Sequence, residues 1–106
     1  MTELLLVEDD PAQRSALQEF LHLELNDLKI HEAGSIAAAR SVLASHPDLS
    51  LIISDLMLPD GQGTDLLAQK SADPPLLILT AQPSIESAVL AIQAGASDYL
   101  SKPVDL

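Results

Sequence analysis

Charged and polar residues follow the apolar segments of this sequence at places where they could act together. In an open parallel sheet, ligands bind in the crevice at the carboxyl ends of the strands, so the residues directly after each predicted strand are the first candidates for chemistry. These residues are Glu8-Asp9-Asp10, Asp55, Thr80 and Lys102-Pro103. We expect them to meet at one edge of a sheet.

Three carboxylates at one edge repel each other strongly unless a cation joins them. Oxygen ligands suit a hard ion such as Mg²⁺, and Asp9 and Asp55 with a backbone carbonyl and several waters would form an octahedral site. The formal charges then balance, with −3 from Glu8, Asp9 and Asp55 against +2 from the ion and +1 from Lys102. A site of this kind can admit a phosphoryl group.

Short apolar runs alternate with longer segments of helical period, which is typical of a parallel sheet covered by helices on both faces. The predicted strands, of which the second is an edge and the third and fourth are central, are residues 4–7, 29–33, 51–54, 76–79 and 98–100. The predicted helices are residues 11–25, 36–45, 64–70 and 85–94. Asp10 and Ser35 are the expected N-caps of the first two helices, and Gly95 is expected to end the fourth. The fold class is therefore α/β, a doubly wound five-stranded parallel sheet.

The apolar spacing also predicts which residues of two helices face the sheet. For the first helix they are Leu17, Phe20, Leu21 and Leu25, and for the fourth helix Ile85, Ala88, Val89 and Ile92. Two further residues of the fourth helix form a small apolar patch on its outer side, Leu90 and Ala94. Three histidines lie away from the strand ends and are interpreted as solvated surface residues, His22, His31 and His46.

Length and composition limit the possible functions. The chain has 106 residues, which is enough for one domain, residues 1–106, but not for two. Its formal charge of −11 argues against direct binding of nucleic acid or of an anionic membrane surface. There is no cysteine, so thiolate chemistry and disulfides are excluded. The first apolar run is too short for a signal peptide or a membrane span, which predicts a cytoplasmic protein.

Four motifs occur in order along the chain: LLVEDD at residues 5–10, SDLMLPDGQG at 54–63, LTA at 79–81 and GASDYLSKP at 95–103. Together they resemble the receiver domain of two-component response regulators, over essentially the whole chain. The resemblance implies a flavodoxin-like sheet with strand order 2-1-3-4-5. It also implies that the family's fifth helix is missing here, because the chain stops soon after the last predicted strand. We expect a longer regulator to supply that helix and an output domain, or a neighbouring chain to cover the exposed face.

The resemblance also implies a role for each residue of the motifs. Asp55 would be the phosphoacceptor, its carboxylate attacking a phosphoryl group to form an acyl phosphate. The implied Mg²⁺ ligands are Asp9 and Asp55, Glu8 through water, and the backbone carbonyl of Met57. Thr80 would hydrogen-bond the phosphoryl group and Lys102 would contact its oxygens. Tyr99 would be the aromatic switch that turns inward as Thr80 moves, and Pro103 would complete a Lys-Pro pair with a cis peptide bond.

The predicted function is that of a switch that accepts a phosphoryl group from a sensor histidine kinase or phosphotransfer protein and relays the change to the fourth helix and fifth strand. It is not an enzyme with an external substrate, since only self-catalysed phosphoryl transfer and dephosphorylation are implied. A homodimer, or a fused output domain such as a transcriptional regulator, would receive the signal. Two alternatives stay open: a receiver-like interaction module that works without phosphorylation, and a haloacid dehalogenase-type phosphatase. The phosphatase normally carries a second Asp two residues after its nucleophile, where this chain has Met57.

Overall fold

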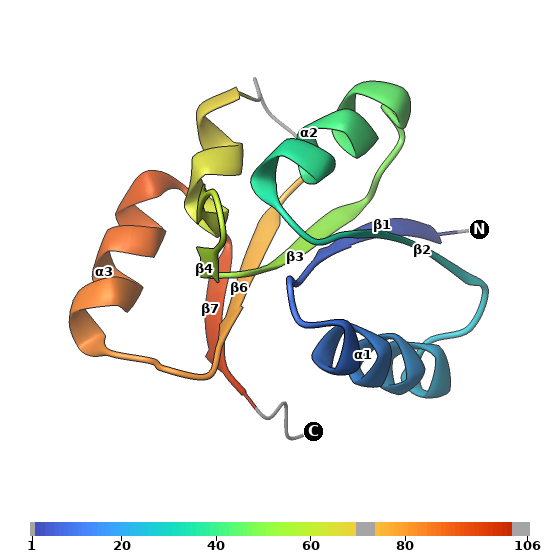
Figure 1. Cartoon of the computed structure of the whole chain (residues 1–106), viewed down its shortest axis with the longest axis horizontal. Helices are drawn as coiled ribbons and strands as arrows, with labels where there is room; N and C mark the ends of the chain where they lie inside the picture. Colours follow the sequence, from blue (N-terminus) through green and yellow to red (C-terminus); the bar gives the residue numbers. More distant parts are fainter. Residues whose placement is uncertain (1, 70–73, 103–106) are drawn as a thin grey trace.

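The structure is a computed structural model that describes residues 2–69 and 74–102. Its centre is a five-stranded parallel sheet with strand order β2-β1-β3-β6-β7 (Figure 1). Its strands are β1 (Thr2–Val7), β2 (Leu28–Ala33), β3 (Leu51–Asp55), β6 (Leu76–Thr80) and β7 (Asp98–Ser101). Counted within this sheet alone, the order is 2-1-3-4-5, so the predicted fold class is confirmed. Every strand runs one or two residues beyond its predicted bounds, because ladder pairing begins before the predicted start of β1 and β2 and continues past the predicted end of β3, β6 and β7.

In the described part of the chain, three α-helices and one 3₁₀-helix connect the strands: α1 (Pro11–Glu24), α2 (Ile36–Ser45), α3 (Ile85–Ala94) and the 3₁₀-helix η1 (Gly63–Gln69). The predicted caps are present. The carboxylate of Asp10 accepts a hydrogen bond from the Ala12 N–H at 2.9 Å, and Ser35 Oγ accepts one from the Ala38 N–H at 3.1 Å. Gly95 ends α3 in the left-handed conformation, with φ of 112°.

The two faces of the sheet are covered unequally. Figure 1 shows α1 on one face and α2, η1 and α3 on the other. The larger hydrophobic core lies under α2, η1 and α3 and includes Leu5, Ile52 and Ile78, while a smaller core under α1 includes Leu6 and Ile53. The alternation follows from the pleat, since successive residues of each strand point to opposite faces.

An apolar groove runs along the α1 face of the sheet. It is lined by Leu17, Phe20 and Leu21 of α1, by Leu25 at the C-cap of that helix, by Leu77 and Leu79 of β6, and by Leu100 of β7. Among residues 2–69 and 74–102, α1 is the one helix that packs on this face. The expectation of a missing fifth helix concerns residues 103–106, which lie outside the described part of the chain. Pro103 of the Lys-Pro pair is one of them.

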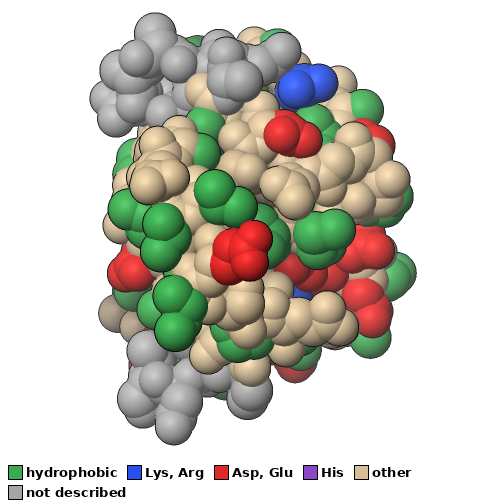
Figure 2. All heavy atoms as spheres, turned by 90° about the vertical axis from the view of Figure 1, so that its left-hand side faces the viewer, with side chains coloured by type: hydrophobic (Ala, Val, Ile, Leu, Met, Phe, Trp, Pro, Cys, Tyr) green, Lys and Arg blue, Asp and Glu red, His purple; other side chains and the backbone are tan. Residues whose placement is uncertain are grey.

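The predicted burial of α3 is wrong. Ile85, Val89 and Ile92 are exposed, whereas Ala91 is the buried residue of this helix. The helix lies beside the edge strand β7 and the short η1, so small side chains at its contact allow close approach while the larger ones face out. Leu90 and Ala94 are exposed as predicted, and Figure 2 shows the side of the molecule on which α3 lies.

Two further expectations are corrected. The third predicted helix is the 3₁₀-helix η1, which begins one residue early at Gly63 after an unpredicted hairpin of β4 (Met57–Leu58) and β5 (Gly61–Gln62). His31 is not a solvated residue, because its side chain is mostly buried, contacts the Glu3 carboxylate at 2.9 Å and packs at a tilted angle against the ring of His46. No helix in the described ranges combines the length and the apolar character needed to cross a membrane.

Candidate functional site

Three acidic side chains meet at the carboxyl edge of the sheet. Glu8 and Asp9 directly follow β1, and Asp55 is the last residue of β3, whose neighbour Ser54 pairs in register with Val7 at the end of β1. One carboxylate oxygen from each of the three lies within 4.8 Å of the others. Glu8 is buried, with 2% of its surface accessible, while Asp9 is exposed. The parallel topology therefore brings together the residues that the sequence predicted.

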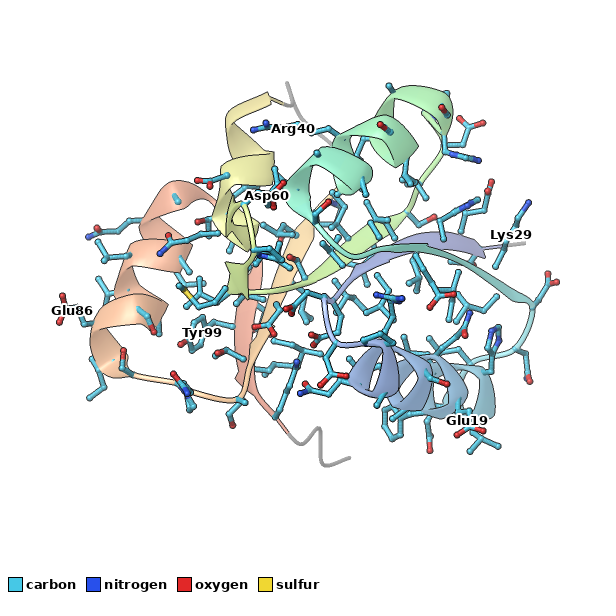
Figure 3. All side chains as sticks on the ribbon, in the orientation of Figure 1. Glu19, Lys29, Arg40, Asp60, Glu86 and Tyr99 are labelled. Atoms are coloured by element: carbon cyan, nitrogen blue, oxygen red, sulfur yellow. The ribbon has the colours of Figure 1, made fainter. Side chains whose placement is uncertain are left out.

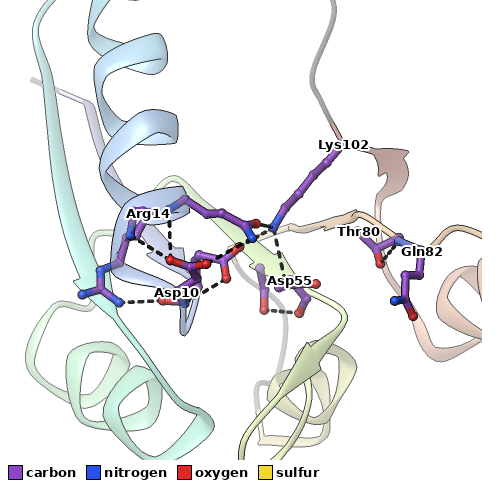
Figure 4. Close-up of polar contacts among 10 residues, drawn as sticks. Asp10, Arg14, Asp55, Thr80, Gln82 and Lys102 are labelled. Carbon is purple, nitrogen blue, oxygen red and sulfur yellow. Dashed lines mark hydrogen bonds and ion pairs between the residues drawn. The ribbon is translucent and has the colours of Figure 1, made fainter.

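Lys102 adds a positive charge to this acidic cluster. It follows β7, where its backbone N–H donates to the Thr80 carbonyl at 2.8 Å, and its side chain reaches back across the sheet edge. The ammonium Nζ donates to Glu8 Oε1, to Asp55 Oδ2 at 3.2 Å and to Gln13 Oε1 at 2.9 Å (Figure 4). One cation is thus shared by two carboxylates, as the predicted charge balance requires.

The environment shifts the pKa values of both ends of this pair. Burial raises the pKa of Glu8 above its ordinary value, and the hydrogen bonds from Lys102 and from the Asp10 N–H oppose that shift only in part. Burial acts to lower the pKa of Lys102, but the hydrogen bond to Glu8 and the charge of Asp55 outweigh it, so this pKa lies above its ordinary value. Lys102 therefore stays protonated at neutral pH.

The donor set of the cluster fits a hard divalent cation. All three candidate side-chain ligands supply carboxylate oxygens, and the exposure of Asp9 leaves room for the water ligands that Mg²⁺ retains. Lys102 supplies only one positive charge against the three carboxylates, so a net negative charge remains to attract such an ion.

A recess lies beside Asp55. It is lined by Asp55, Leu56, Met57, Thr80, Ala81, Gln82, Ser84 and Ser87. Thr80 ends β6, is buried, and its hydroxyl accepts a hydrogen bond from the Gln82 N–H at 3.1 Å. Met57 follows Asp55 by two residues and lines the recess, and its carbonyl as a metal ligand stays a prediction. The recess is open to a small group that approaches Asp55.

Tyr99 belongs to β7, and its side chain extends toward α3 (Figure 3). Its ring is half-buried against the larger core, and its hydroxyl contacts Ser87 Oγ and accepts from the Ser84 N–H at 3.4 Å. Ser84 is the N-cap of α3, so the tyrosine contacts the first turn of that helix. In the described contacts, Thr80 and Tyr99 have different hydrogen-bond partners, and the predicted relay between them stays a prediction.

Sequence reasoning missed several residues that shape the site. Gly63 packs so closely on β3 that a Cβ there would lie 2.4 Å from the Asp55 carbonyl oxygen and 2.6 Å from Ser54 Oγ. Only glycine fits without displacing the backbone of Asp55. Gln13 and Arg14, on the first turns of α1, also contact the cluster. Gly63 stands in one of the quoted motifs, whereas nothing in the local sequence distinguishes Arg14 from other helix-surface residues.

Comparisons with known proteins agree with this geometry. The sequence profile of the response regulator receiver domain matches residues 4–106. The response regulator protein PilR of Pseudomonas aeruginosa is 37% identical, and the match covers 96% of this chain and 23% of PilR. The KDP operon transcriptional regulatory protein KdpE of Escherichia coli is 40% identical, with 97% of this chain and 45% of KdpE covered. The chain thus spans less than half the length of these two relatives.

Solved structures show the same fold. The non-phosphorylated receiver domain of HemR from Leptospira biflexa superposes with a TM-score of 0.84 at 31% identity, covering 99% of this chain and 85% of that one. A response regulator protein from Burkholderia pseudomallei, solved with a phosphorylated aspartic acid, a calcium ion and citrate, has a TM-score of 0.84 at 28% identity. That match covers 99% of this chain and 62% of the other.

Proposed function

Because this chain belongs to the response regulator receiver domain family, we propose that it is a phosphorylation-operated switch in which Asp55 is the phosphoacceptor. One observation carries this assignment. The Asp55 carboxylate ends a central strand, faces an open recess, and lies 3.2 Å from the ammonium of Lys102 beside two further carboxylates. A nucleophilic carboxylate next to a fixed cation and a cation-binding acidic pair is the arrangement that phosphoryl transfer needs.

In the proposed reaction, an Asp55 carboxylate oxygen attacks the phosphorus of a phosphohistidine in line. The bond from phosphorus to oxygen forms as the bond from phosphorus to the histidine nitrogen breaks, and the imidazole leaves with that electron pair. Asp9 and Asp55, Glu8 through water, and the Met57 carbonyl would hold Mg²⁺, which supplies positive charge to the phosphoryl oxygens. The product is an acyl phosphate on Asp55.

Two residues on the other strands would hold the transferred group. Lys102 already contacts Asp55, and its ammonium can turn to a phosphoryl oxygen as a point charge. Thr80 lines the same recess, and its hydroxyl, which accepts from the Gln82 N–H, would donate its O–H to a phosphoryl oxygen. The phosphoryl group adds about −1.5 to −2 charge, which is a change large enough to move these side chains.

The signal would leave through Tyr99 and α3. Tyr99 contacts the first turn of α3, and that helix exposes an apolar face that includes Ile85 and Leu90. We propose a sensor histidine kinase or a phosphotransfer protein as the donor. The output would be a homodimer or a fused domain, such as the transcriptional regulators named among the relatives.

Labelling with a small phosphodonor tests this function. We expect acetyl phosphate with Mg²⁺ to add one phosphoryl mass to the wild-type chain and to Asp48→Asn, and to leave Asp55→Asn unlabelled in intact-mass spectra. Asp48 is a suitable control because it is exposed in the loop before β3, at the opposite end of that strand. Undiminished labelling of Asp55→Asn would contradict the assignment.

The same samples separate the two alternative functions. An interaction module that works without phosphorylation predicts a wild-type chain that acquires no label and shows no response to Mg²⁺. A phosphatase predicts continued turnover of an aryl phosphate ester. We expect neither result, because the phosphorylation-linked positions Asp55, Thr80 and Lys102 meet at one edge and the position two residues after Asp55 is Met57.

A further inference from the structure

Arg14 joins the loop of the acidic pair to the neighbouring edge strand. It lies in α1, and its guanidinium donates twice: Nη1 donates to the Glu8 backbone carbonyl at 2.6 Å, and Nε donates to Glu32 Oε1 on β2 at 3.1 Å. Figure 4 shows the side chain turned back from α1 toward the loop. The contacted carbonyl belongs to the peptide unit that connects Glu8 to Asp9.

The contact with Arg14 is one of two that hold the backbone of Glu8 in place. The Glu8 backbone N–H donates directly to the Ala33 carbonyl of β2 at 2.9 Å, and its carbonyl is tied to β2 through Arg14 and Glu32. Gly34, the residue after β2, lies beside the guanidinium, and a Cβ there would be in van der Waals contact with Arg14 Nη1 at 3.4 Å. The backbone N–H and the backbone carbonyl of Glu8 are therefore both connected to β2.

We propose that Arg14 is a positioning residue that holds the Glu8–Asp9 peptide in the orientation needed for divalent-cation binding. The inference rests on the proposed function of the acidic cluster as a Mg²⁺ site. Arg14 touches neither the carboxylate of Asp9 nor that of Asp55 in the described contacts, so it acts through the backbone of the ligand residues. A planar guanidinium suits this task because its N–H donors are held in one rigid plane, whereas the donors of an ammonium rotate on a flexible side chain.

Charge and positioning predict opposite results when Arg14 is removed. A positive charge near the cluster repels a dication, so its loss by electrostatics alone would strengthen Mg²⁺ binding. Loss of the backbone contact instead leaves the loop to be ordered by the ion, which weakens binding. The direction of the change in Kd therefore separates a positioning role from a purely electrostatic one.

The experiment is a calorimetric titration of Mg²⁺ into the full chain and three variants, at a temperature well below the melting of each. We expect Arg14→Ala to raise the Kd about tenfold, as loss of outer contacts to metal ligands typically does. Arg14→Lys keeps the charge but lacks the rigid planar donor group that joins the Glu8 carbonyl to Glu32, so we expect most of the loss to remain. Arg40→Ala removes the same charge from the exposed side of α2, and we expect its Kd to stay close to wild type.

Each outcome has a distinct meaning. Unchanged or tighter binding by Arg14→Ala, or full recovery in Arg14→Lys, would overturn the positioning role while leaving the Mg²⁺ site in place. A wild-type chain that does not bind Mg²⁺ would overturn the proposed site and this inference with it. If Arg14→Ala does not fold, as judged by circular dichroism, the comparison of Arg14→Lys with Arg40→Ala decides the question.

Discussion

The ammonium of Lys102 is the cation that makes the acidic edge tolerable in the absence of a metal. It contacts the buried carboxylate of Glu8 and the carboxylate of Asp55, and 11% of its own side chain is accessible. A buried carboxylate that loses its partner is costly, because neither water nor another cation replaces it. The stability of the chain and the proposed binding of Mg²⁺ are therefore expected to be linked through this residue.

Replacement of Lys102 tests that link. We expect Lys102→Ala to lower the free energy of unfolding by about 2 kcal/mol without Mg²⁺, because Glu8 is left buried and unpaired. Millimolar Mg²⁺ should restore part of the loss by binding the freed carboxylates. Urea unfolding with and without Mg²⁺ measures both effects. Lys29→Ala, on an exposed position of β2, is the control, and equal stability of the two variants would contradict the prediction.

At the scale of the elements, α2 has two caps of different origin. Ser35 caps it locally, while the carboxylate of Asp60, from the β4–β5 hairpin, accepts hydrogen bonds from the Ile36 N–H at 2.8 Å and the Ala37 N–H at 3.0 Å. Figure 3 places Asp60 beside this helix. These two bonds lower the pKa of Asp60, so the loop that follows the Asp55 strand is tied to α2 by a charged group.

The lowered pKa of Asp60 predicts a pH dependence. The unfolded chain binds a proton at Asp60 more readily than the folded chain, so this group stabilises the fold above its unfolded pKa of about 3.9 and loses the effect as pH falls through the lower folded value. We expect Asp60→Asn to melt below wild type at neutral pH and the difference to close in acid. Thermal melts across pH, with Asp48→Asn as control, measure it. A difference that persists at the acid end would refute this account.

The contact between β7 and α3 can be followed with an intrinsic probe. The chain has one tyrosine and no tryptophan, so its ultraviolet fluorescence reports on Tyr99 alone. We expect Ser87→Ala to increase quenching by iodide, because the Tyr99 hydroxyl loses its partner on α3 and the ring becomes more accessible. Ser41→Ala on the exposed side of α2 should quench like wild type. Identical quenching of both variants would show that Ser87 does not hold the ring.

At the scale of the whole molecule, the charge and the apolar surface are unevenly distributed. The formal charge of −11 includes the cluster of Glu8, Asp9 and Asp55 at one end of the sheet. The groove beside α1 and the outer side of α3 expose leucine and isoleucine, as in Leu100, Leu90 and Ile85. Contiguous apolar surface of this kind binds hydrophobic dyes and partners more readily than single exposed leucines do.

The groove predicts dye binding by the folded chain. We expect an anilinonaphthalene dye to fluoresce with the native protein and the signal to fall in Leu100→Asn, because Leu100 lines the groove and is partly exposed. Leu23→Asn is the matched control, since Leu23 on α1 is 83% exposed and lies outside the groove. An equal loss of signal in both variants would point to general surface adsorption.

Much of this architecture was predictable because its causes are local. Three kinds of signal act within a few residues: apolar runs of strand length, an N-cap residue close to its hydrogen-bond partner, and a glycine after a helix. These signals predicted the five strands and the bounds of α2 and α3. The membership of the acidic edge was also predictable, because parallel strands all end on the same side and Glu8, Asp9, Asp55 and Lys102 follow strands.

What the sequence determined by itself is the order of the elements and the residues at the carboxyl edge, since both depend on pattern along the chain. Only the tertiary structure decided which side of α3 is exposed, why Gly63 must lack a side chain, and which atoms Arg14, Asp60 and Tyr99 contact. These features join segments that are distant in sequence. Their energies depend on distances and burial in the folded chain. The spacing of apolar residues along the sequence does not specify these quantities, so only the tertiary structure could show them.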